Sequence, residues 1–577
     1  MKTQSELRTL LRSVDHKSYP AYKSLAGVWK FDRYVLVIDH VQGDPFAAPS
    51  SLHVEVAHKD AKFPAAYYGE DCVRIALQDY LVRQISKQFE QYNFKAKGSG
   101  KSGLLSVSRC GQAVLERSAC QITESGIIAR FHVGFPAFGR TINAGELEKI
   151  LFEFLPRCVE NSLFYGRLDR QKVEDVIFLA EDQEALRGIL KEEKLVSFVA
   201  NQSILPRKSG VSDLPMTDSV PFVSPASMER TFVLPHRGRI SGMAIPAGIT
   251  LIVGGGYHGK STLLEAIQMG VYNHISGDGR EFVVTDDTAV KLRAEDGRSV
   301  RNVDISLFIN DLPNKKNTKV FTTEDASGST SQAAAVMEGV EAGTGLFLID
   351  EDTSATNFMV RDEFMQQVIS RDKEPITPFL ERAKDLYEQA GISTILVAGS
   401  SGAFFYIADY ILMMDHYHPV DITERVKELC GEHTAPRVQA PGFAIPDFAR
   451  VLPPFKGGRK GGGRDWHGRE RGQEERHERM KVKSYGLESF SLDKEEVNVR
   501  YLEQLLDPEQ VTALAYLLRY GLEQVMDGKK TVRKAVEMIC VQWEKEGWKP
   551  FCSSYIPCGL AKPRIQEIFA CIDRFRG

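Results

Sequence analysis

The chain has no apolar run of the roughly 18–20 residues that a membrane helix needs. The longest candidate, residues 403–414, is short and carries Asp409. The N-terminal stretch MKTQSELRTLLRSV likewise lacks the apolar segment of a secretory signal. We therefore expect a cytoplasmic protein that does not cross a membrane by itself.

The sequence also lacks cysteines spaced as zinc ligands, and it lacks a strong net charge. The nine cysteines are scattered, odd in number and not spaced with histidines as zinc ligands are, so we expect reduced thiols. A net charge of −4 argues against nucleic-acid or membrane binding by the whole surface, although it permits a local basic patch. With 577 residues the chain is too long for one core, so we expect about three domains.

The composition and hydrophobic periodicity of the sequence divide the chain into five regions. Residues 1–205 mix helical patterns with short alternating strands, which predicts an N-terminal α+β domain, and a Ser/Pro-rich connector follows at 206–228. From 229 to 440 strands alternate with helices, which is typical of an α/β domain with a parallel sheet covered on both faces. Residues 441–483 form a Gly/Arg-rich linker, and 484–577 have the periodicity of a small C-terminal helical domain.

The segment GGGYHGKST, residues 254–262, matches the phosphate-loop pattern G-x-x-x-x-G-K-[ST] between a buried strand and a helix. Glycines let backbone N–H groups close around phosphate oxygens, and the following helix N-terminus favours anions. We predict that ATP binds here, with Lys260 facing its β- and γ-phosphates and the Ser261 hydroxyl on Mg²⁺. The expected nucleotide contacts are Gly254, Gly255, Gly256, Tyr257, His258, Gly259, Lys260, Ser261 and Thr262.

Three other features have simpler explanations than chemistry. His258 occupies a permissive position of the phosphate loop, so we expect its side chain to lie over the phosphates or in solvent. KGSGKSG, residues 97–103, lacks the first glycine of the pattern and is interpreted as a flexible basic loop. DHVQGDP, residues 39–45, is interpreted as a structural turn, because its glycine and proline explain it by geometry.

An apolar strand that ends in acids, GLFLIDED, spans residues 345–352. Asp350 suits a carboxylate that organises the metal together with Ser261, and Glu351 could polarise the attacking water. Acids at a strand end are common by themselves. Downstream of a phosphate loop in the same alternating domain, they favour catalysis, and we take Lys260, Asp350 and Glu351 as the candidate catalytic residues.

These motifs resemble the ABC ATPases. DEDTSATN, residues 350–357, is similar to the Walker B and D-loop run of that family, and ASGSTSQ, residues 326–332, is similar to its LSGGQ signature. Ser327 precedes Asp350 by 23 residues, which is the usual separation in the family. The resemblance implies nucleotide contacts from the signature and an aromatic residue that stacks on adenine. In this sequence these contacts fall on Phe232, Ser327, Gly328 and Ser329.

A closer resemblance is to the group known as predicted ATPases of the ABC class. It rests on five segments that follow one another in the same order and spacing. They are IDHVQGDPFAAPS (38–50), VGFPAFGRTI (133–142), VKLRAEDGRSV (290–300), EDASGSTSQ (324–332) and LVAGSSGAFF (396–405). The resemblance covers most of the chain up to about residue 430, together with the C-terminal helices.

The chain also departs from the ABC pattern. Where related proteins carry a switch histidine after a strand, it has Gly399, which offers the γ-phosphate no side chain. Ser400 and Ser401 are both candidates to substitute. A Q-loop glutamine has no clear equivalent, and Asp304 and Ser306 are the alternatives. We therefore expect ATP binding with slow hydrolysis.

In ABC ATPases the signature of one protomer completes the ATP site of another, so the single phosphate loop and single signature imply a homodimer. We predict an ATPase that acts as a clamp, which ATP closes and hydrolysis releases. The alternative function is a nucleotide-gated binding or scaffold protein with negligible turnover. A transporter ATPase is disfavoured by the additional N- and C-terminal domains.

Residues 456–472, KGGRKGGGRDWHGRERG, indicate what such a clamp could hold. Between Lys456 and Lys483 there are ten basic residues against five acidic ones, a local charge of +5. Such a segment can follow a phosphate backbone, and Trp466 could stack on a base. We predict contact with RNA or another nucleic acid, with a solvated linker as the alternative.

Overall fold

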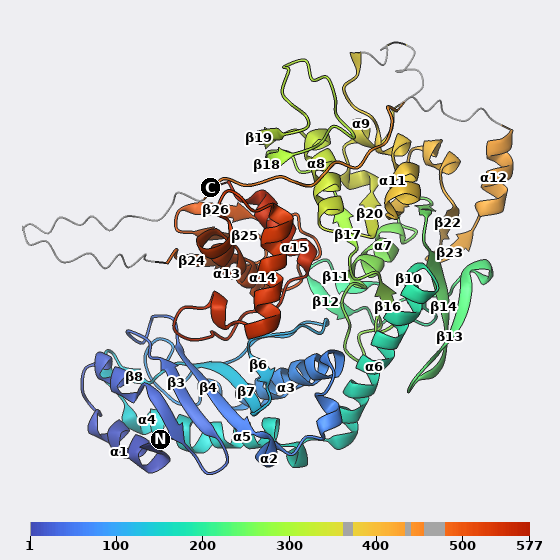
Figure 1. Cartoon of the computed structure of the whole chain (residues 1–577). Coiled ribbons are helices and arrows are strands. Elements are labelled where there is room, and N and C mark those ends of the chain that lie inside the picture. The colour runs from blue at the N-terminus through green and yellow to red at the C-terminus, as the bar shows by residue number, and fades with distance from the viewer. Residues whose placement is uncertain (1, 362–367, 369–372, 433–439, 455–478, 577) are drawn as a thin grey trace, which may run out of the picture.

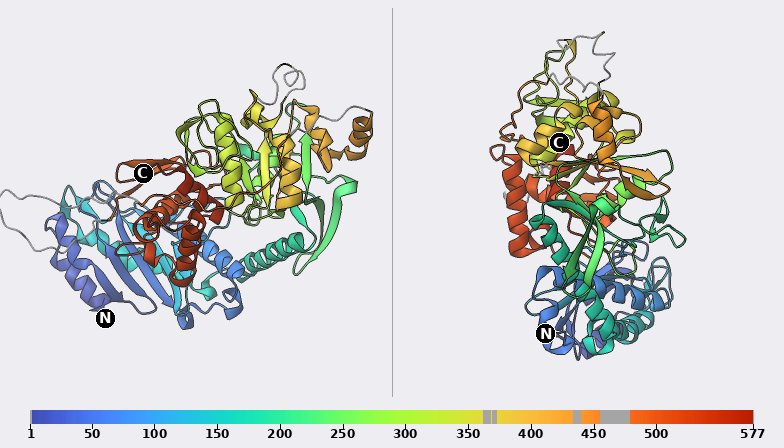
Figure 2. Two further views of the ribbon diagram at one scale, coloured as in Figure 1. Left: turned by 45° about the horizontal axis from the view of Figure 1, so that its top comes forward. Right: turned by 90° about the vertical axis from the view of Figure 1, so that its right-hand side faces the viewer.

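The computed structural model describes residues 2–361, 368, 373–432, 440–454 and 479–576. Three parts follow one another in sequence, but in space the C-terminal part lies between the other two (Figures 1 and 2). Ion pairs join it to both. In the N-terminal part, Nη2 of Arg117 lies 2.7 Å from Oδ2 of Asp507 in the C-terminal part. In the central part, Nη1 of Arg293 lies 2.6 Å from Oε1 of Glu503, also in the C-terminal part.

The N-terminal part is built on a seven-stranded sheet in the order β1-β2-β3-β4-β7-β5, with β6 beside β7. Along β3 the side chains of Leu36 and Ile38 are buried and their neighbours are more exposed, as expected for a sheet with one face on a core. Helix α3 covers that sheet, and its Phe89 packs edge-on against Phe131 of β7 with ring centroids 5.3 Å apart.

The elements of this part are short strands with helices before and after them. The sheet comprises β1 (Lys2–Thr3), β2 (Gly27–Lys30), β3 (Val35–His40), β4 (Ser50–Ala57), β5 (Leu105–Ser106), β6 (Cys120–Ile122) and β7 (Gly126–Val133). A small hairpin is formed by β8 (Ala137–Phe138) and β9 (Thr141–Ile142). The helices are α1 (Gln4–Ser13), α2 (His58–Ala61), α3 (Asp71–Tyr92), α4 (Ala144–Lys149) and α5 (Leu155–Leu163).

Two loops of this part pack against each other. The backbone N–H of Lys101, inside residues 97–103, donates to the carbonyl of Pro45 at 2.8 Å. This segment is therefore a packed turn and not the flexible loop that its composition suggests. The carboxylate of Asp44 accepts the N–H of Phe46 at 2.8 Å, which agrees with a structural turn at residues 39–45.

Helix α6 (Arg170–Glu192) joins the N-terminal part to the central part (Figure 1). Its first half packs Val173 and Ile177 into the N-terminal core, while Leu186 and Leu190 pack with Phe198 in a separate cluster. The next strand, β10 (Leu195–Ala200), pairs with β14 (Gly238–Pro246) and β16 (Val283–Thr285), and β13 (Glu229–Leu234) completes that sheet. Strand pairing thus puts residues 195–200 with the central part, ahead of the boundary expected at 205.

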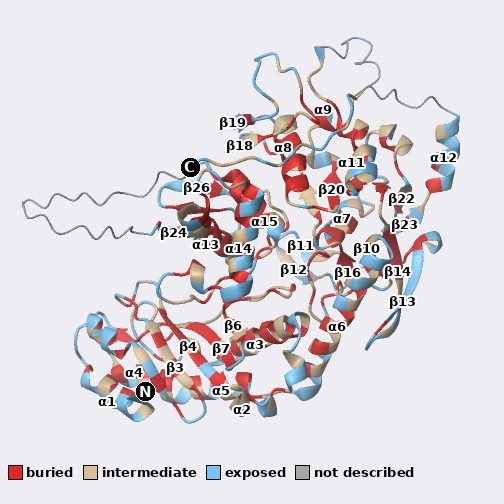
Figure 3. Ribbon diagram, viewed as in Figure 1, coloured by how far each residue is buried: buried red, intermediate tan, exposed pale blue. Residues whose placement is uncertain are grey.

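The central part is organised by a six-stranded sheet in the order β17-β20-β21-β15-β22-β23. The first five strands are parallel and β23 runs antiparallel to β22. β20 and β21 are buried along their whole length, because helices cover both faces of the sheet (Figure 3). This is the α/β domain that the alternating pattern predicts.

The strands of that sheet are β15 (Ile249–Val253), β17 (Val290–Leu292), β20 (Leu346–Asp350), β21 (Ser393–Val397), β22 (Tyr410–Asp415) and β23 (His418–Asp421). A separate pair is formed by β18 (Arg298–Val303) and β19 (Phe321–Ala326). The helices are α7 (Lys260–Met269), α8 (Gly328–Glu341), α9 (Thr356–Met359), α11 (Ala383–Ala390) and α12 (Thr423–Gly431).

The C-terminal part contains the expected helices and also a three-stranded sheet. The helices α13 (Pro508–Tyr520), α14 (Val532–Glu546) and α15 (Ile565–Arg574) enclose a core of their own. The sheet comprises β24 (Val482–Tyr485), β25 (Ser489–Leu492) and β26 (Glu495–Asn498). Each of these strands has four residues and two of them are mostly exposed, so the hydrophobic pattern that would predict them is weak.

The two connecting segments make contacts within their described residues. Residues 206–228 contain a hairpin of β11 (Arg207–Ser209) and β12 (Ser212–Pro215). In the segment expected as a linker at 441–483, Arg450 pairs with Glu341 at 2.5 Å and also with Asp573. Residues 455–478 lie outside the described residues, and with them the predicted nucleic-acid segment. Among the helices that the structure does describe, none has the length and apolar character of a membrane span.

Candidate nucleotide-binding site

The phosphate loop leads from β15 directly into α7, as the sequence predicts. Gly254 has φ +138°, and a Cβ there would lie 2.6 Å from the carbonyl oxygen of Met414. Gly259, the N-cap of α7, has φ +96°. Both positions favour glycine because their φ angles are positive. At Gly254 the close approach of the Met414 carbonyl also leaves no room for a side chain.

Backbone N–H groups line the loop. Within the described residues, the N–H groups of residues 256–262 donate to no protein acceptor. The Lys260 ammonium donates to the carbonyls of Gly254 at 2.6 Å and Gly255 at 2.9 Å, so it lies over the loop. Ser261 is exposed at the first turn of α7. Unpaired amides, a lysine and a helix N-terminus suit a polyphosphate.

Two acids stand near the loop because of the strand order. Asp350 ends β20, and β21 is the single strand between β20 and β15. The carboxylate of Asp350 accepts the N–H of Asp352 at 3.2 Å, and Asp350 is largely buried. The carboxyl ends of these parallel strands meet at one edge of the sheet, as in other ligand sites of α/β folds.

Glu351 is held by the loop after β21. Its carboxylate accepts the N–H of Gly399 at 2.7 Å, the N–H of Ser400 at 3.1 Å and the hydroxyl of Ser400 at 2.5 Å. Burial raises the pKa of Glu351, but the hydrogen bonds from Ser400 and Gly399 outweigh it, so the net pKa lies below the ordinary value. Of the two serines that the sequence leaves open, Ser400 is the one whose side chain meets Glu351.

The signature segment begins helix α8. Ser327 is the N-cap of this helix and is exposed, and its hydroxyl lies 3.0 Å from that of Thr330. Among the described contacts, neither Ser327 nor Ser329 hydrogen-bonds to the phosphate loop of its own chain. The N-terminus of the signature helix α8 is therefore exposed at Ser327.

A buried glutamine that the motif comparison leaves without a role connects the signature helix to the strand-end acids. The side-chain amide of Gln332 donates to the Ser354 hydroxyl at 2.9 Å and accepts the N–H of Ala355 at 2.8 Å. It is fully buried. Gln332 therefore joins α8 to the segment that follows Glu351.

Two expected contributors remain predictions. Phe232 lies on β13, and its ring packs against Phe198 with centroids 5.4 Å apart, and its contact with adenine stays a prediction. Asp304, an alternative for the missing glutamine, accepts the N–H and the hydroxyl of Ser306 at 2.9 and 2.6 Å. Both Q-loop alternatives are thus engaged with each other in a local turn.

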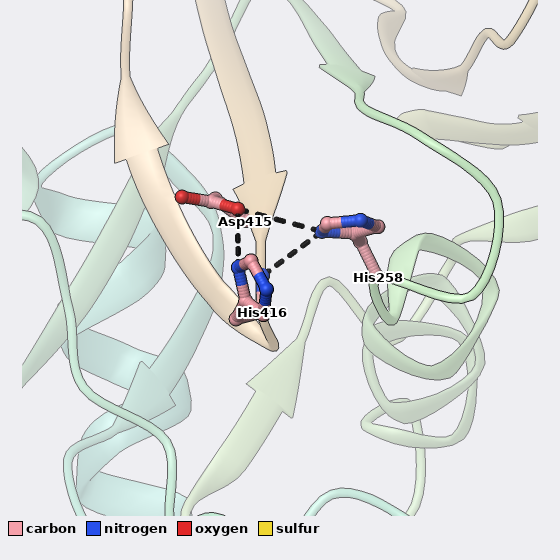
Figure 4. Close-up of side chains that lie close together, drawn as sticks. All are labelled: His258, Asp415 and His416. Carbon is pink, nitrogen blue, oxygen red and sulfur yellow. Dashed lines mark hydrogen bonds and ion pairs between the residues drawn. The ribbon is translucent and has the colours of Figure 1, made fainter.

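The side chain of His258 faces the β22–β23 turn and is partly exposed. There it meets Asp415 and His416, two residues that the sequence did not single out (Figure 4). His258 precedes Asp415 by 157 residues, and the parallel pairing of β15 with β22 brings it to the adjacent pair Asp415 and His416.

Comparison with known proteins gives three family models that match consecutive segments. The N-terminal model of ATPases of the ABC class matches residues 4–166, and the P-loop domain model of the ABC ATPases matches residues 169–448. The model of the MRB1590 C-terminal domain matches residues 481–577.

A curated relative is the uncharacterized protein MJ1628 of Methanocaldococcus jannaschii, 32% identical over 233 residues, which are 38% of this chain and 50% of that protein. The chain thus spans half the length of this relative. The solved structure of cbiO1 from Clostridium perfringens shares 13% identity over 42% of this chain and 92% of its own. The ADP conformation of MJ1267, an ATP-binding cassette of an ABC transporter, shares 11% sequence identity over 41% of this chain and 95% of its own. Both have a TM-score of 0.25, which decides nothing about the fold.

The family matches cover the N-terminal, central and C-terminal parts in the order in which the structure has them. The central match includes the phosphate loop, the strand-end acids and the signature. The chain belongs to the ATPases of the ABC class.

Proposed function

We propose that the protein binds Mg·ATP at the phosphate loop, hydrolyses it slowly, and closes two copies of the chain against each other while ATP is bound. The observation that carries this proposal is the position of Glu351. It follows the strand-end acid Asp350 and is fixed by Gly399 and Ser400 on the neighbouring loop. A carboxylate fixed and ionised at this place is suited to orient a water molecule.

The residues of the loop fit ATP by their chemistry. The unpaired N–H groups of residues 256–262 would bind the phosphate oxygens, and Lys260 would leave the loop carbonyls to face the β- and γ-phosphates. Ser261 and Asp350 would hold Mg²⁺, which when bound neutralises phosphate charge. Both offer oxygen atoms, the donors that this ion prefers.

Slow turnover follows from the loop after β21. Gly399 has no side chain for the γ-phosphate, and the hydroxyl of Ser400 is already engaged by Glu351. Glu351 can orient and activate water, but among its described contacts there is no imidazole to stabilise charge on the phosphate being transferred. We expect hydrolysis to be slower than in ABC proteins that carry a switch histidine.

Closure of two copies follows from the exposed signature. Ser327 and the first N–H groups of α8 would approach the phosphates of the partner chain, where a helix N-terminus stabilises negative charge. One phosphate loop and one signature per chain then give two equal sites in a symmetric pair. ATP would act as the bridge, and its hydrolysis would release the pair.

The partner of the clamp is proposed from the sequence. Residues 456–472 are rich in arginine and glycine, and the charge of +5 between residues 456 and 483 stands out in a chain of net charge −4. We infer that this segment contacts single-stranded RNA or another nucleic acid through its phosphates.

Steady-state phosphate release separates this proposal from a scaffold with negligible turnover. The wild type should release phosphate with Mg·ATP, and Glu351→Gln should abolish that release while it keeps ATP affinity. Glu388→Gln is a matched control, because Glu388 is an exposed glutamate on α11 paired only with Lys384 at 3.7 Å among the described contacts. Release that is absent in the wild type, or unchanged in Glu351→Gln, would favour the scaffold.

A further inference from the structure

His258, Asp415 and His416 converge where the phosphate loop meets the β22–β23 turn (Figure 4). Nδ1 of His258 lies 3.5 Å from Oδ1 of Asp415, and Nδ1 of His416 lies 2.7 Å from the same oxygen. One ligand atom from each residue lies within 4.8 Å of the other two. The rings of the two histidines are edge to face with centroids 5.0 Å apart.

We propose that these three residues form a binding site for a transition-metal ion of the zinc class. Two imidazoles and one carboxylate are the donors that such ions prefer, and three protein ligands leave a fourth position for water. Ligand atoms about 2.0–2.1 Å from a tetrahedral zinc ion are about 3.3 Å apart. The 3.5 Å pair already has this spacing, and the 2.7 Å pair needs only to open slightly.

The protonation of the cluster is compatible with metal binding. The backbone N–H of His416 donates to Nδ1 of His258 at 2.9 Å, so this nitrogen carries a lone pair. Nδ1 of His416 donates its proton to the Asp415 carboxylate. A metal ion at Nδ1 of His416 would select the other neutral tautomer, with the proton on Nε2, and at His258 it would replace the hydrogen bond from the amide.

The turn that carries two of the ligands is held in an uncommon conformation. It has two residues, His416 with φ +46° and Tyr417 with φ +71°, where glycine or asparagine is usual. Two hydrogen bonds to His258 hold it there, one from the His416 amide to Nδ1 and one from the Tyr417 N–H to the carbonyl at 3.2 Å. The turn is thus fixed against the phosphate loop before any ion binds.

The cluster is distinct from the proposed magnesium site. Asp350 ends β20, on one side of β15, whereas Asp415 ends β22, on the other side. The two sites also differ in chemistry, because magnesium prefers oxygen donors and the cluster offers two nitrogens. An ion can reach the cluster from solvent, since the side chains of His416, Asp415 and His258 are 84%, 53% and 32% exposed. Once bound, it would brace the phosphate loop against the hairpin.

Zinc titration of the full-length protein tests the site. Reduced, chelator-stripped protein without nucleotide is titrated with Zn²⁺ in competition with a chromophoric chelator. We expect one ion per chain, and at least about tenfold weaker binding in Asp415→Asn and in His416→Asn, since even changes around metal ligands cost this much. Asparagine at 416 tolerates the positive φ, so the turn persists. His418→Asn, an exposed histidine on the same hairpin, is the matched control and should bind as the wild type does.

The absorption spectrum with Co²⁺ distinguishes this site from the nine cysteines of the chain. A nitrogen–oxygen site gives visible bands without the strong near-ultraviolet absorption of cobalt–thiolate bonds. Wild-type binding that carries only the thiolate spectrum would overturn the proposal. So would His416→Asn binding as tightly as the wild type, or His418→Asn losing as much affinity as His416→Asn.

Discussion

The carboxylate of Glu351 accepts the backbone N–H of Gly399 at 2.7 Å, across the adjacent ends of β20 and β21. The resemblance to ABC ATPases implies that Gly399 occupies the position of the switch histidine. In this chain the loop instead contacts the candidate base, through two backbone N–H groups and the hydroxyl of Ser400. The loop therefore positions Glu351.

Ser400→Ala should move the acid limb of the ATPase rate to higher pH. Glu351 must be ionised to act as a base, so activity is lost as pH falls through its folded-state pKa. The Ser400 hydroxyl helps to hold that pKa below the ordinary value, so removing it raises the pKa. The measurement is the pH dependence of kcat. Ser401→Ala is the control, because the Ser401 hydroxyl accepts the N–H of Ala403 instead; equal shifts in both variants would contradict the assignment.

Lys260→Ala should weaken ATP binding by about 2–3 kcal/mol, the usual loss for a hydrogen bond to a charged group. The ammonium lies over the phosphate loop, within hydrogen-bond distance of the carbonyls of Gly254 and Gly255. Calorimetric titration with ATP measures the effect. Lys384→Ala, an exposed lysine on α11, should bind ATP as the wild type does. Unchanged affinity in Lys260→Ala would remove the phosphate-loop assignment.

The sequence was sufficient for residues whose neighbours in the chain define them. Lys260 begins the helix that follows a glycine-rich loop, and Asp350 ends an apolar strand, so the local pattern predicts both positions. The contact of His258 with Asp415 and His416 depends on the pairing of β15 with β22 and on the positive φ of a turn without glycine. No local pattern contains that information.

Domain limits were harder to predict for the same reason. β10 pairs with strands that come 38 or more residues later in the chain, and the helix before it shares its side chains between two cores. The sequence pattern of β10 predicts a strand, but it does not indicate which sheet that strand joins. The choice between Ser400 and Ser401 likewise required the direction of each hydroxyl, which adjacent positions in one loop do not reveal.

Arg450→Met should destabilise the fold by about 3–5 kcal/mol, because it leaves two buried carboxylates without their cation. Arg450 pairs with Glu341, at the end of the signature helix, and with Asp573 of α15. Urea unfolding followed by tryptophan fluorescence measures the loss. Arg12→Met is the control, since Arg12 pairs with Glu148 at the surface and its loss should leave the midpoint unchanged.

The stability of the wild type should also depend on Glu341. Burial, with the charge of Asp573, raises the pKa of Glu341 to about 7, above its ordinary value of 4.5. Between these values the folded chain keeps a proton that the unfolded chain releases. The contribution of this group is thus complete below pH 4.5 and is lost as pH rises through about 7. In Glu341→Gln this part of the pH dependence should disappear from the urea midpoints. If the same slope persists in the variant, another group titrates.

Deletion of residues 456–472 tests the nucleic-acid proposal. Binding of single-stranded RNA and DNA by the full chain should fall steeply with salt, because arginines and lysines release counterions from the phosphates. The deleted protein should bind more weakly and with a shallower salt slope. If affinity and slope are both unchanged, the segment is only a tether, and any contact with nucleic acid lies on the folded parts.

The dependence of molecular mass on Mg·ATP tests the central claim most directly. Light scattering of Glu351→Gln protein at micromolar concentration should show a monomer without nucleotide and a dimer with Mg·ATP. Adding Ser327→Arg, at the exposed N-cap of α8, should keep ATP binding and block the dimer. A monomer with and without Mg·ATP, or a dimer that Ser327→Arg leaves intact, would contradict sites shared between two chains.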